Sequence, residues 1–286
     1  MKNRLLYTSL LLLAGGISNY ACAVDWSDTS LSVRTGNQFR EPFNPNAISK
    51  NILALTHASG YQYGSNFLNV DFLQSDRKDP KSLHQTRGAQ EAYVVYRHTF
   101  DLGKISGQEL KYGVVRGLGL TAGFDWNSKS DVGYNSRKRM LVIGPTLMWD
   151  VPGFFNTSLL LLEESNAPSG AFPPIANVKG RYHYKAHPML SMSWGIPLND
   201  KLSLEGYANV IAKKGINEVG QQTGTETNID MQVMWDLSSM LNSKPKSLRI
   251  GLEYQYWNNK FGNTAAITGG RGYRAKSPMI RADFHF

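Results

Sequence analysis

The stretch Ser247–Trp257, SLRIGLEYQYW, alternates between two kinds of side chain. One parity is apolar or aromatic: Leu248, Ile250, Leu252, Tyr254 and Tyr256. The other parity carries Arg249, Glu253 and Gln255. Because successive side chains of a strand point to opposite faces, this pattern predicts a β-strand with one face suited to lipid and the other to water.

Two further segments repeat the alternation. In Ile229–Leu237 the polar parity holds Asp230 and Gln232, and in Arg181–Trp194 it holds Arg181, His183 and Lys185. A slip of one residue would turn the basic side chains of the second segment into lipid, at a cost of about 2–4 kcal/mol for each near the midplane. The polar parity is therefore expected to face the interior of a barrel.

Period-2 segments recur along the whole chain, and we expect twelve strands. They are Thr29–Thr35, Ser49–Ala58, Ser65–Leu73, Gln90–Phe100, Tyr112–Trp126, Met140–Asp150, Thr157–Ser165, Arg181–Trp194, Leu202–Ala212, Ile229–Leu237, Ser247–Trp257 and Ser277–Phe286. The connections between them alternate between long and short. This rhythm predicts an all-β fold: a twelve-stranded antiparallel up-and-down transmembrane β-barrel with short periplasmic turns and long extracellular loops. A soluble sandwich is the alternative, but it gives no reason for loops sorted in this way.

The first 23 residues have the character of an export signal. Lys2 and Arg4 precede the apolar run Leu5–Ile17, and Ala21-Cys22-Ala23 resembles a cleavage site. We expect residues 1–23 to be removed and residues 24–286 to form the barrel. Downstream of them, no apolar run reaches the length of a membrane-spanning helix. The expected location is the outer membrane of a Gram-negative bacterium, as an integral protein.

Aromatic residues lie at the ends of the expected strands. Tryptophan and tyrosine prefer the membrane interface, so we expect an aromatic girdle there, formed by Trp126, Trp149, Trp194, Trp235 and Trp257. The last strand ends with Phe284 and Phe286, which resemble the C-terminal signal read by the barrel assembly machinery. Pro145 and Pro188 lie inside expected strands, where we predict bulges or shifted strand ends. The second strand has two plausible faces, and neither is assigned.

Several segments resemble the nucleoside-specific channel-forming family of outer-membrane proteins (Tsx/OmpK-like). They are Arg40–Lys50, Asn51–Asp76, Glu226–Asp236, Gly251–Asn263 and Pro278–Phe286. The chain is more similar to another branch of that family than to its nucleoside transporter. The resemblance implies twelve strands, a narrow monomeric pore and nucleoside uptake, and some members of the family are phage receptors. The transporter's nucleoside-contacting residues do not align with named positions of this chain.

The expected lumen carries charges of both signs with tyrosines and amides between them. The candidate solute-binding residues are Asn69, Asp71, Glu91, Tyr93, Arg97, Arg181, His183, Lys185, Glu205, Tyr207, Asp230, Gln232, Arg249, Glu253, Gln255, Arg281 and Asp283. They are either cross-strand ion pairs that fill a solvated interior or a polar track for solutes. Weak binding at several such sites suits conduction.

The expected function is passive diffusion of small polar solutes, with nucleosides as the best single class. The alternatives are a surface receptor for phage or adhesion, a weakly anion-selective pore based on the basic row Arg181, His183, Lys185 and His187, and an outer-membrane hydrolase. No G-x-S-x-G motif occurs, and His98 is expected on the outer face without a serine beside it. We therefore expect no enzyme, catalytic residue, metal or cofactor.

The expected partners are membrane lipid, lipopolysaccharide, the barrel assembly machinery and small polar solutes. Lipopolysaccharide phosphates would bind basic residues of the long loops, among them Lys129, Lys138 and Lys214. Nucleic acid is not expected as a partner, and a monomer is favoured.

Overall fold

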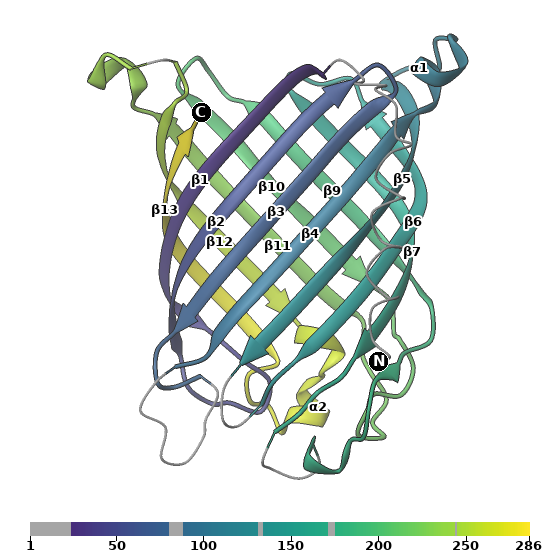
Figure 1. The fold of residues 1–286 in the computed structure, drawn as a ribbon, viewed down its shortest axis with the longest axis vertical. Helices are drawn as coiled ribbons and strands as arrows, with labels where there is room; N and C mark the ends of the chain where they lie inside the picture. Colours follow the sequence, from purple (N-terminus) through teal and green to yellow (C-terminus); the bar gives the residue numbers. More distant parts are fainter. Residues whose placement is uncertain (1–23, 80–87, 131–133, 171–174, 244) are drawn as a thin grey trace, which may run out of the picture.

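The computed structural model describes residues 24–79, 88–130, 134–170, 175–243 and 245–286 as one β-barrel (Figure 1). Residues 1–23, expected to be an export signal, lie outside the described residues. The strands that form the wall are β1 Val24–Phe39, β2 Ile48–Tyr61, β3 Gly64–Ser75, β4 Gln90–Asp101, β5 Val115–Ser130, β6 Arg137–Trp149, β7 Phe154–Asn166, β9 His187–Pro197, β10 Leu202–Ile211, β11 Glu226–Asp236, β12 Leu248–Asn258 and β13 Arg274–His285. A two-residue strand, β8 Tyr182–His183, pairs with the end of β7.

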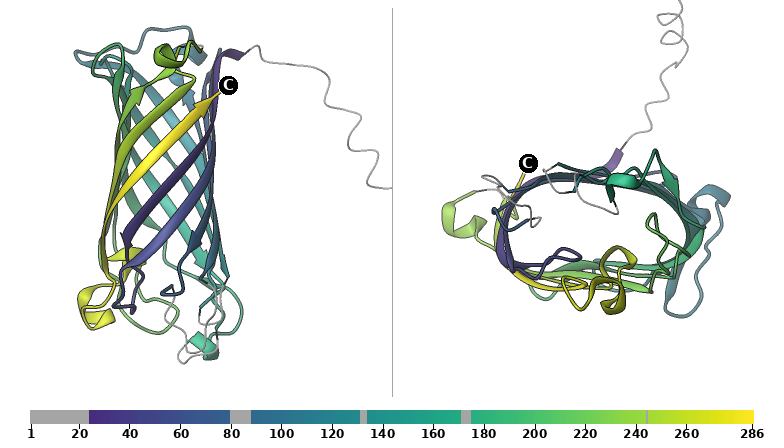
Figure 2. Two further views of the ribbon diagram at one scale, coloured as in Figure 1. Left: turned by 90° about the vertical axis from the view of Figure 1, so that its left-hand side faces the viewer. Right: turned by 90° about the horizontal axis from the view of Figure 1, so that it is seen from below.

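Each wall strand pairs antiparallel with its neighbours, and the sheet closes on itself. Strand β1 pairs with both β2 and β13, which joins the two ends of the chain, and β7 pairs with both β6 and β9. Closure satisfies the backbone hydrogen bonds of every wall strand, as the apolar core of a membrane requires. The predicted twelve-stranded antiparallel barrel is therefore confirmed, and its cross-section is flattened (Figure 2).

The two faces of the wall differ as the alternation predicts. Large apolar side chains such as Leu53, Leu141, Leu161 and Leu252 are exposed on the outside, while charged side chains such as Glu253 are buried inside. An apolar exterior around a polar interior is the arrangement of an integral outer-membrane barrel. On the unassigned second strand, Leu53, Leu55 and His57 share the outer face, because Ala54 and Thr56 are opposite the inward Asp71 and Asn69.

The connections sort between the two ends of the barrel. Short turns and both described chain ends lie at one end, which Figure 1 shows at the top. The connections 40–47, 76–89, 131–136, 167–186, 212–225 and 259–273 join the strands at the other end. Most of them are longer, but 102–114 and 237–247 at the first end exceed 40–47 and 131–136, so the predicted sorting by length is not exact. We call these ends the short-turn end and the long-loop end. They correspond to the predicted periplasmic and extracellular sides.

Helical segments occur only in connections among the described residues. They are α1 Leu102–Ser106, η1 Ile175–Asn177, η2 Ser238–Leu241, η3 Lys260–Gly262 and α2 Ala265–Thr268. None of the described helices is long and apolar enough to cross a membrane.

The largest error in the predicted strands concerns Arg181–Trp194. The wall strand β9 begins only at His187, and residues 181–186 belong to the connection from β7. This placement also accounts for Pro188, which is the second residue of β9, just before the pairing with β10 begins. At Pro145 the β6–β7 pairing is interrupted at residues 144 and 145 and resumes at Thr146 in the same register, so no bulge forms there.

Candidate functional site

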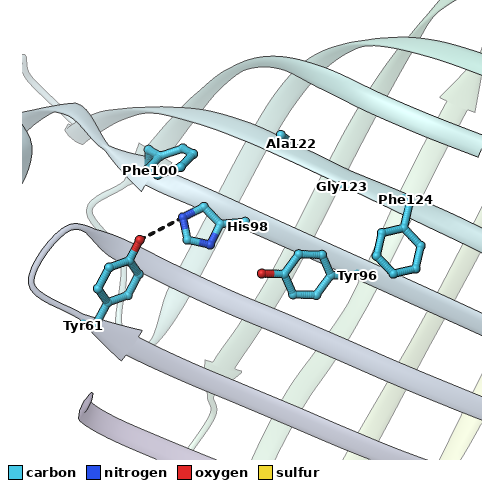
Figure 3. Close-up of a pocket in the computed structure, with 7 residues that line it drawn as sticks. All are labelled: Tyr61, Tyr96, His98, Phe100, Ala122, Gly123 and Phe124. Carbon is cyan, nitrogen blue, oxygen red and sulfur yellow. Dashed lines mark hydrogen bonds between the residues drawn. The ribbon is translucent and has the colours of Figure 1, made fainter. Parts of the chain in front are cut away.

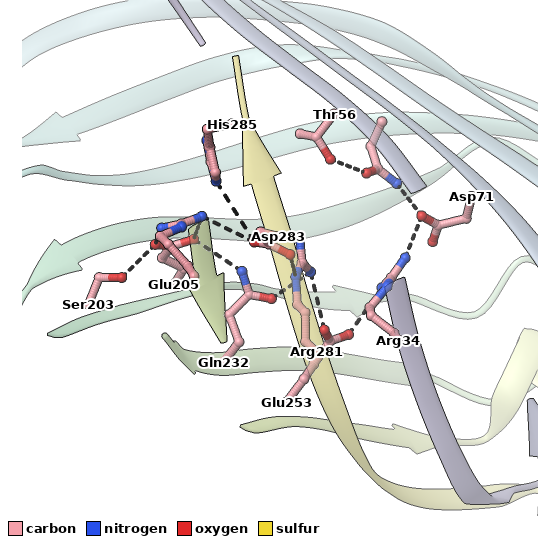
Figure 4. Close-up of polar contacts among 12 residues, drawn as sticks. Arg34, Thr56, Asp71, Ser203, Glu205, Gln232, Glu253, Arg281, Asp283 and His285 are labelled. Atoms are coloured by element: carbon pink, nitrogen blue, oxygen red, sulfur yellow. Dashed lines mark hydrogen bonds and ion pairs between the residues drawn. The ribbon is translucent and has the colours of Figure 1, made fainter. Parts of the chain in front are cut away.

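A chain of alternating charges runs across one inner wall of the barrel, from β3 to β10 (Figure 4). Its members in spatial order are Asp71, Arg34, Glu253, Arg281, Asp283, Arg249 and Glu205. The joining distances include 2.5 Å from Arg34 to Asp71, 2.7 Å from Arg281 to Asp283 and 3.2 Å from Arg249 to Asp283. Gln232 extends the network by donating to Glu205 and accepting from Arg281. Each guanidinium group thus lies between two carboxylates, and the wall is electrostatically self-compensated.

Glu253 binds a residue from each of the two strands that close the barrel, β1 and β13, whose pairing we call the seam. Arg34 of β1 and Arg281 of β13 are direct cross-strand partners, and like charges in that position repel. Glu253 accepts from Arg34 through Oε1 at 3.0 Å and from Arg281 through Oε2 at 3.1 Å, and its side chain has no exposed surface. One buried carboxylate therefore bridges the two arginines that are paired across the β1–β13 seam, and Asp71 and Asp283 supply their second partners.

The facing wall is built from smaller polar groups. Arg97 pairs with Asp125 at 2.5 Å, and Tyr93 donates to the same carboxylate at 3.1 Å. Nearer the short-turn end, hydroxyl groups form a continuous row across β4, β5, β6 and β7: Thr99, Thr121, Thr146 and Ser158, with oxygen separations of 2.6–2.8 Å. Because glycines flank Thr121 on the inward face of β5, this wall is smooth as well as polar.

Neutral groups remain for a solute in the middle of the lumen. Tyr207 is partly exposed there, and its hydroxyl accepts from Asn228 at 3.4 Å. The amide oxygens of Asn209 and Asn228 are buried and have no hydrogen-bond partner among the described residues. Tyr207 of β10 is paired with Asp230 and Tyr93 of β4 with Asp71, and both aspartates face inward. Both tyrosines therefore face the lumen, whereas the two amide oxygens are enclosed by the wall.

A first ionic cluster lies at the long-loop end of the lumen. Glu41 contacts Lys50 at 2.8 Å and Lys260 at 3.1 Å, and it lies 3.7 Å from Lys129. Asp79 pairs with Lys129 at 2.7 Å. Burial alone would raise the pKa of Glu41, but the three ammonium groups hold it well below its ordinary value. Burial lowers the pKa of Lys260, since Glu41 is shared among three cations and compensates each only in part.

A second ionic cluster lies beside the first. Glu164 accepts from Lys138 at 3.0 Å and from Lys214 at 2.7 Å. The ring of Phe261 links the two clusters, because the ammonium of Lys138 lies 3.9 Å and that of Lys260 5.2 Å from its centre. Phe261 has the left-handed backbone conformation, with φ of 59°, which is unusual for a bulky residue and is held here by these contacts.

Most of the predicted lumen residues face inward, and the structure brings them together. Besides the residues above, Asn69 donates to Asp71, Gln255 donates to Asp230, and Glu91 accepts from Asn127. Arg181, His183 and Lys185 do not line the transmembrane lumen, because they lie in the connection between β7 and β9. Arg181 instead donates to the backbone oxygen of Arg137 and to Ser165. The expected basic row inside the barrel is therefore absent from the described wall.

Four of the five tryptophans expected in the girdle lie on the outer face of the barrel. Trp126 and Trp235 are exposed on the outer face, and Trp149 and Trp194 follow the outward parity of their strands. Trp257 instead follows the inward parity of β12 and donates to Glu226 at 2.6 Å. Its ring also packs on Lys260. The same alternation that placed Arg249 and Glu253 inside could have revealed this.

Other lumen residues were missed from the sequence. Arg34 lies in a strand whose pattern is short, and the hydroxyl row consists of residues common in any strand. Lys129, Lys138 and Lys214, expected as surface charges, are buried at the mouth. The described residues also contain no group of three or more potential metal ligands arranged to hold a metal ion.

No known family matches the sequence, and no curated protein matches it. Among solved structures, the NanC porin has a TM-score of 0.46 and 13% identity, covering 89% of this chain and 98% of that one. The KdgM porin has a TM-score of 0.43 and 10% identity, covering 90% and 99%. The translocator domain of the autotransporter NalP from Neisseria meningitidis has a TM-score of 0.40 and 11% identity, covering 97% and 93%. Likeness at this level assigns no solute.

Proposed function

We propose that this protein is an outer-membrane channel for passive diffusion of small, uncharged polar solutes, with nucleosides as the best-matched class. The observation that carries the proposal is the pairing of charges inside the barrel. Arg34, Arg97, Arg249 and Arg281 of the described wall each bind at least one carboxylate. An arginine that is already neutralised attracts a solute anion weakly.

The neutral groups at the centre of the lumen favour a flat solute that has hydrogen-bond donors. The rings of Tyr93 and Tyr207 offer faces for stacking, and stacking of a base on an aromatic side chain contributes about 1–3 kcal/mol. The hydroxyl of Tyr207, which accepts from Asn228, is a further polar contact for such a solute. Binding of this strength retards a solute without trapping it, as conduction requires.

An anion-selective pore is the less favoured alternative. That hypothesis rested on a basic row in the lumen, but the described residues of the row that precede β9 lie outside the wall. The proposal assigns no catalytic step to the chain and no solute to its surface loops. Lipopolysaccharide remains a proposed partner of the long loops, and the assembly machinery remains a proposed partner of the last strand.

Single-channel recording of the refolded protein tests this function. We expect nucleosides to block the ion current more strongly than sugars or amino acids of similar size, and asymmetric salt to give a reversal potential near zero. Replacing Tyr207 with Leu should weaken the nucleoside block about tenfold, because one stacking face is lost. Tyr254→Leu on the outer face of β12 is the matched control and should leave the block unchanged.

The possible results separate the parts of the proposal. Equal block by all solutes would contradict nucleoside preference, and a strongly anion-selective reversal potential would contradict the neutral lumen. Absence of current from a correctly folded barrel would contradict the channel itself. Swelling of liposomes that contain the protein, measured with the same solutes, gives an independent readout.

A further inference from the structure

The outer face of the barrel carries a polar cluster where lipid would be expected to meet only apolar atoms. It lies on β2, β3 and β4 near the short-turn end and consists of Asn66 together with Tyr61, Tyr96 and His98. Figure 3 shows the last three of these residues. The parity is outward, because Tyr96 and His98 alternate with the inward Arg97. Ionisable and amide side chains on a membrane-facing surface are rare and costly, which makes the cluster a candidate binding site.

Hydrogen bonds hold the cluster in one arrangement. Asn66 Oδ1 accepts from Tyr96 at 2.8 Å and from His98 Nδ1 at 2.7 Å. His98 Nε2 is 2.9 Å from the Tyr61 hydroxyl, which therefore donates to it. The amide oxygen of Asn66 is thus fully used, whereas its two amide hydrogens have no acceptor among the described residues. A pair of oriented donors remains directed away from the network.

The cluster borders an open pocket of about 530 Å³ with apolar walls. Phe100 and Phe124 lie on opposite sides of it in Figure 3, and Ala122 lies between them. The rings of His98 and Phe100 are 4.1 Å apart and those of Tyr96 and Phe124 are 5.6 Å apart, so the walls are packed. Such a pocket accepts hydrocarbon, and Asn66 lies beside it, hydrogen-bonded to the lining residues Tyr96 and His98.

A cation completes the site at the short-turn end. Lys104 of α1 donates to the backbone oxygen of Tyr61 at 3.2 Å, and its side chain is 46% exposed. Its ion pair with Asp25 is long, at 3.7 Å, and exposed, so the ammonium remains available to an anion. Along the wall, Lys104 lies beyond the short-turn end of β4, Phe100 comes next, and Asn66 of β3 is level with His98 at the side of the pocket. A cation at the rim, an apolar pocket below it and an amide beside the pocket match a phosphate, an acyl chain and an ester-linked glycerol.

We propose that this pocket binds one glycerophospholipid of the periplasmic leaflet. The phosphate pairs with Lys104, an ester oxygen accepts from the amide of Asn66, and an acyl chain lies between Phe100 and Phe124. Both the charge complementarity at Lys104 and the continuity of the pocket with the lipid-facing surface favour a lipid over a second protein chain.

Native mass spectrometry of the full protein, titrated with phosphatidylglycerol, tests the site. The wild type should retain one lipid more tightly than all others. Asn66→Leu, which removes the donors, and Lys104→Gln, which removes the cation, should each weaken that binding about tenfold. Asn51→Leu is the matched control, because Asn51 is an exposed outward asparagine at the long-loop end of β2.

The outcomes are distinguishable from misfolding and from other occupants. Heat-modifiable gel mobility shows whether each variant is a folded barrel, and Lys104→Gln lies in an exposed connection outside the wall. Loss of the retained lipid in Asn66→Leu and Lys104→Gln but not in Asn51→Leu supports the site. Equal retention in all four proteins overturns it, as does a protein dimer in the wild type that Asn66→Leu abolishes.

Discussion

At the scale of the residue, the two carboxylate oxygens of Glu253 bind Arg34 and Arg281, which would otherwise repel each other. Replacing Glu253 with Gln keeps the shape but removes the charge that separates Arg34 from Arg281. Removing one partner of a buried ion pair costs about 3–5 kcal/mol. We expect the variant to lower the free energy of unfolding in urea by this amount, measured by tryptophan fluorescence in detergent micelles.

Glu205→Gln is the control for this prediction. Glu205 ends the chain of charges and contacts one arginine, Arg249, whereas Glu253 bridges two. The Glu205 side chain is 22% exposed, so water compensates part of the loss. The change should therefore destabilise the barrel less than Glu253→Gln. Equal effects would show that the seam has no special dependence on Glu253.

The sequence did not predict which side chains pair with one another inside the barrel. Alternation places Arg249, Glu253 and Asp283 on the inner face but does not say which strands become neighbours across the seam. Arg34 was missed because ion pairing, and not the pattern of its own strand, gives it its role. Pairing depends on barrel closure, which joins residues separated by most of the chain.

At the scale of the element, the connections hold the features that strand patterns do not predict. The alternation of apolar and polar side chains identified every wall strand, because each strand faces lipid on one side and water on the other. The predicted strand was too long at residues 181–186, because the alternation continues there although these residues belong to a connection at the long-loop end. Lys129 and Lys214 were predicted to be solvated surface charges, because the carboxylates that they bind lie far away in the sequence.

The connection that carries Glu41 should make stability depend on pH. The pKa of Glu41 is depressed in the folded state by Lys129, Lys260 and Lys50 against the cost of burial. Its contribution is therefore fully present above the unfolded pKa of about 4.3 and is lost as the pH falls toward the folded value. Wild type should exceed Glu41→Gln in unfolding free energy by roughly 3 kcal/mol at pH 7, with the difference shrinking below pH of about 4.

Urea titrations of both proteins between neutral and acid pH measure that difference. Asp79 and Glu91 also face Lys50, but they are present in both proteins, so their titration largely cancels. Gln222→Glu, an exposed change in another long connection, is a charge control and should give no such convergence. A difference that stays constant down to the most acid pH would contradict the depressed pKa of Glu41.

At the scale of the whole molecule, closure and insertion make different demands on the same strand. Inside the barrel, Arg281 and Asp283 of β13 bind Glu253 and Arg249 of β12, and the backbone of β13 pairs with β1. Outside it, Phe284 and Phe286 stack with ring centres 6.1 Å apart and are 53% and 67% exposed. Their exposure means that the folded barrel gains little from them, which leaves recognition during assembly as the role we predict.

Phe286→Ala should therefore separate assembly from stability. We expect the amount of folded, heat-modifiable barrel in the outer membrane to fall severalfold, while the urea midpoint of the protein that does fold changes little, because an exposed residue loses few contacts. Leu252→Ala is the matched control, since Leu252 is 70% exposed on the lipid-facing side of β12. It removes similar apolar surface without touching the terminus and should leave the yield unchanged. If both variants lower the yield equally, the effect is one of lipid contact and the terminal phenylalanine carries no signal.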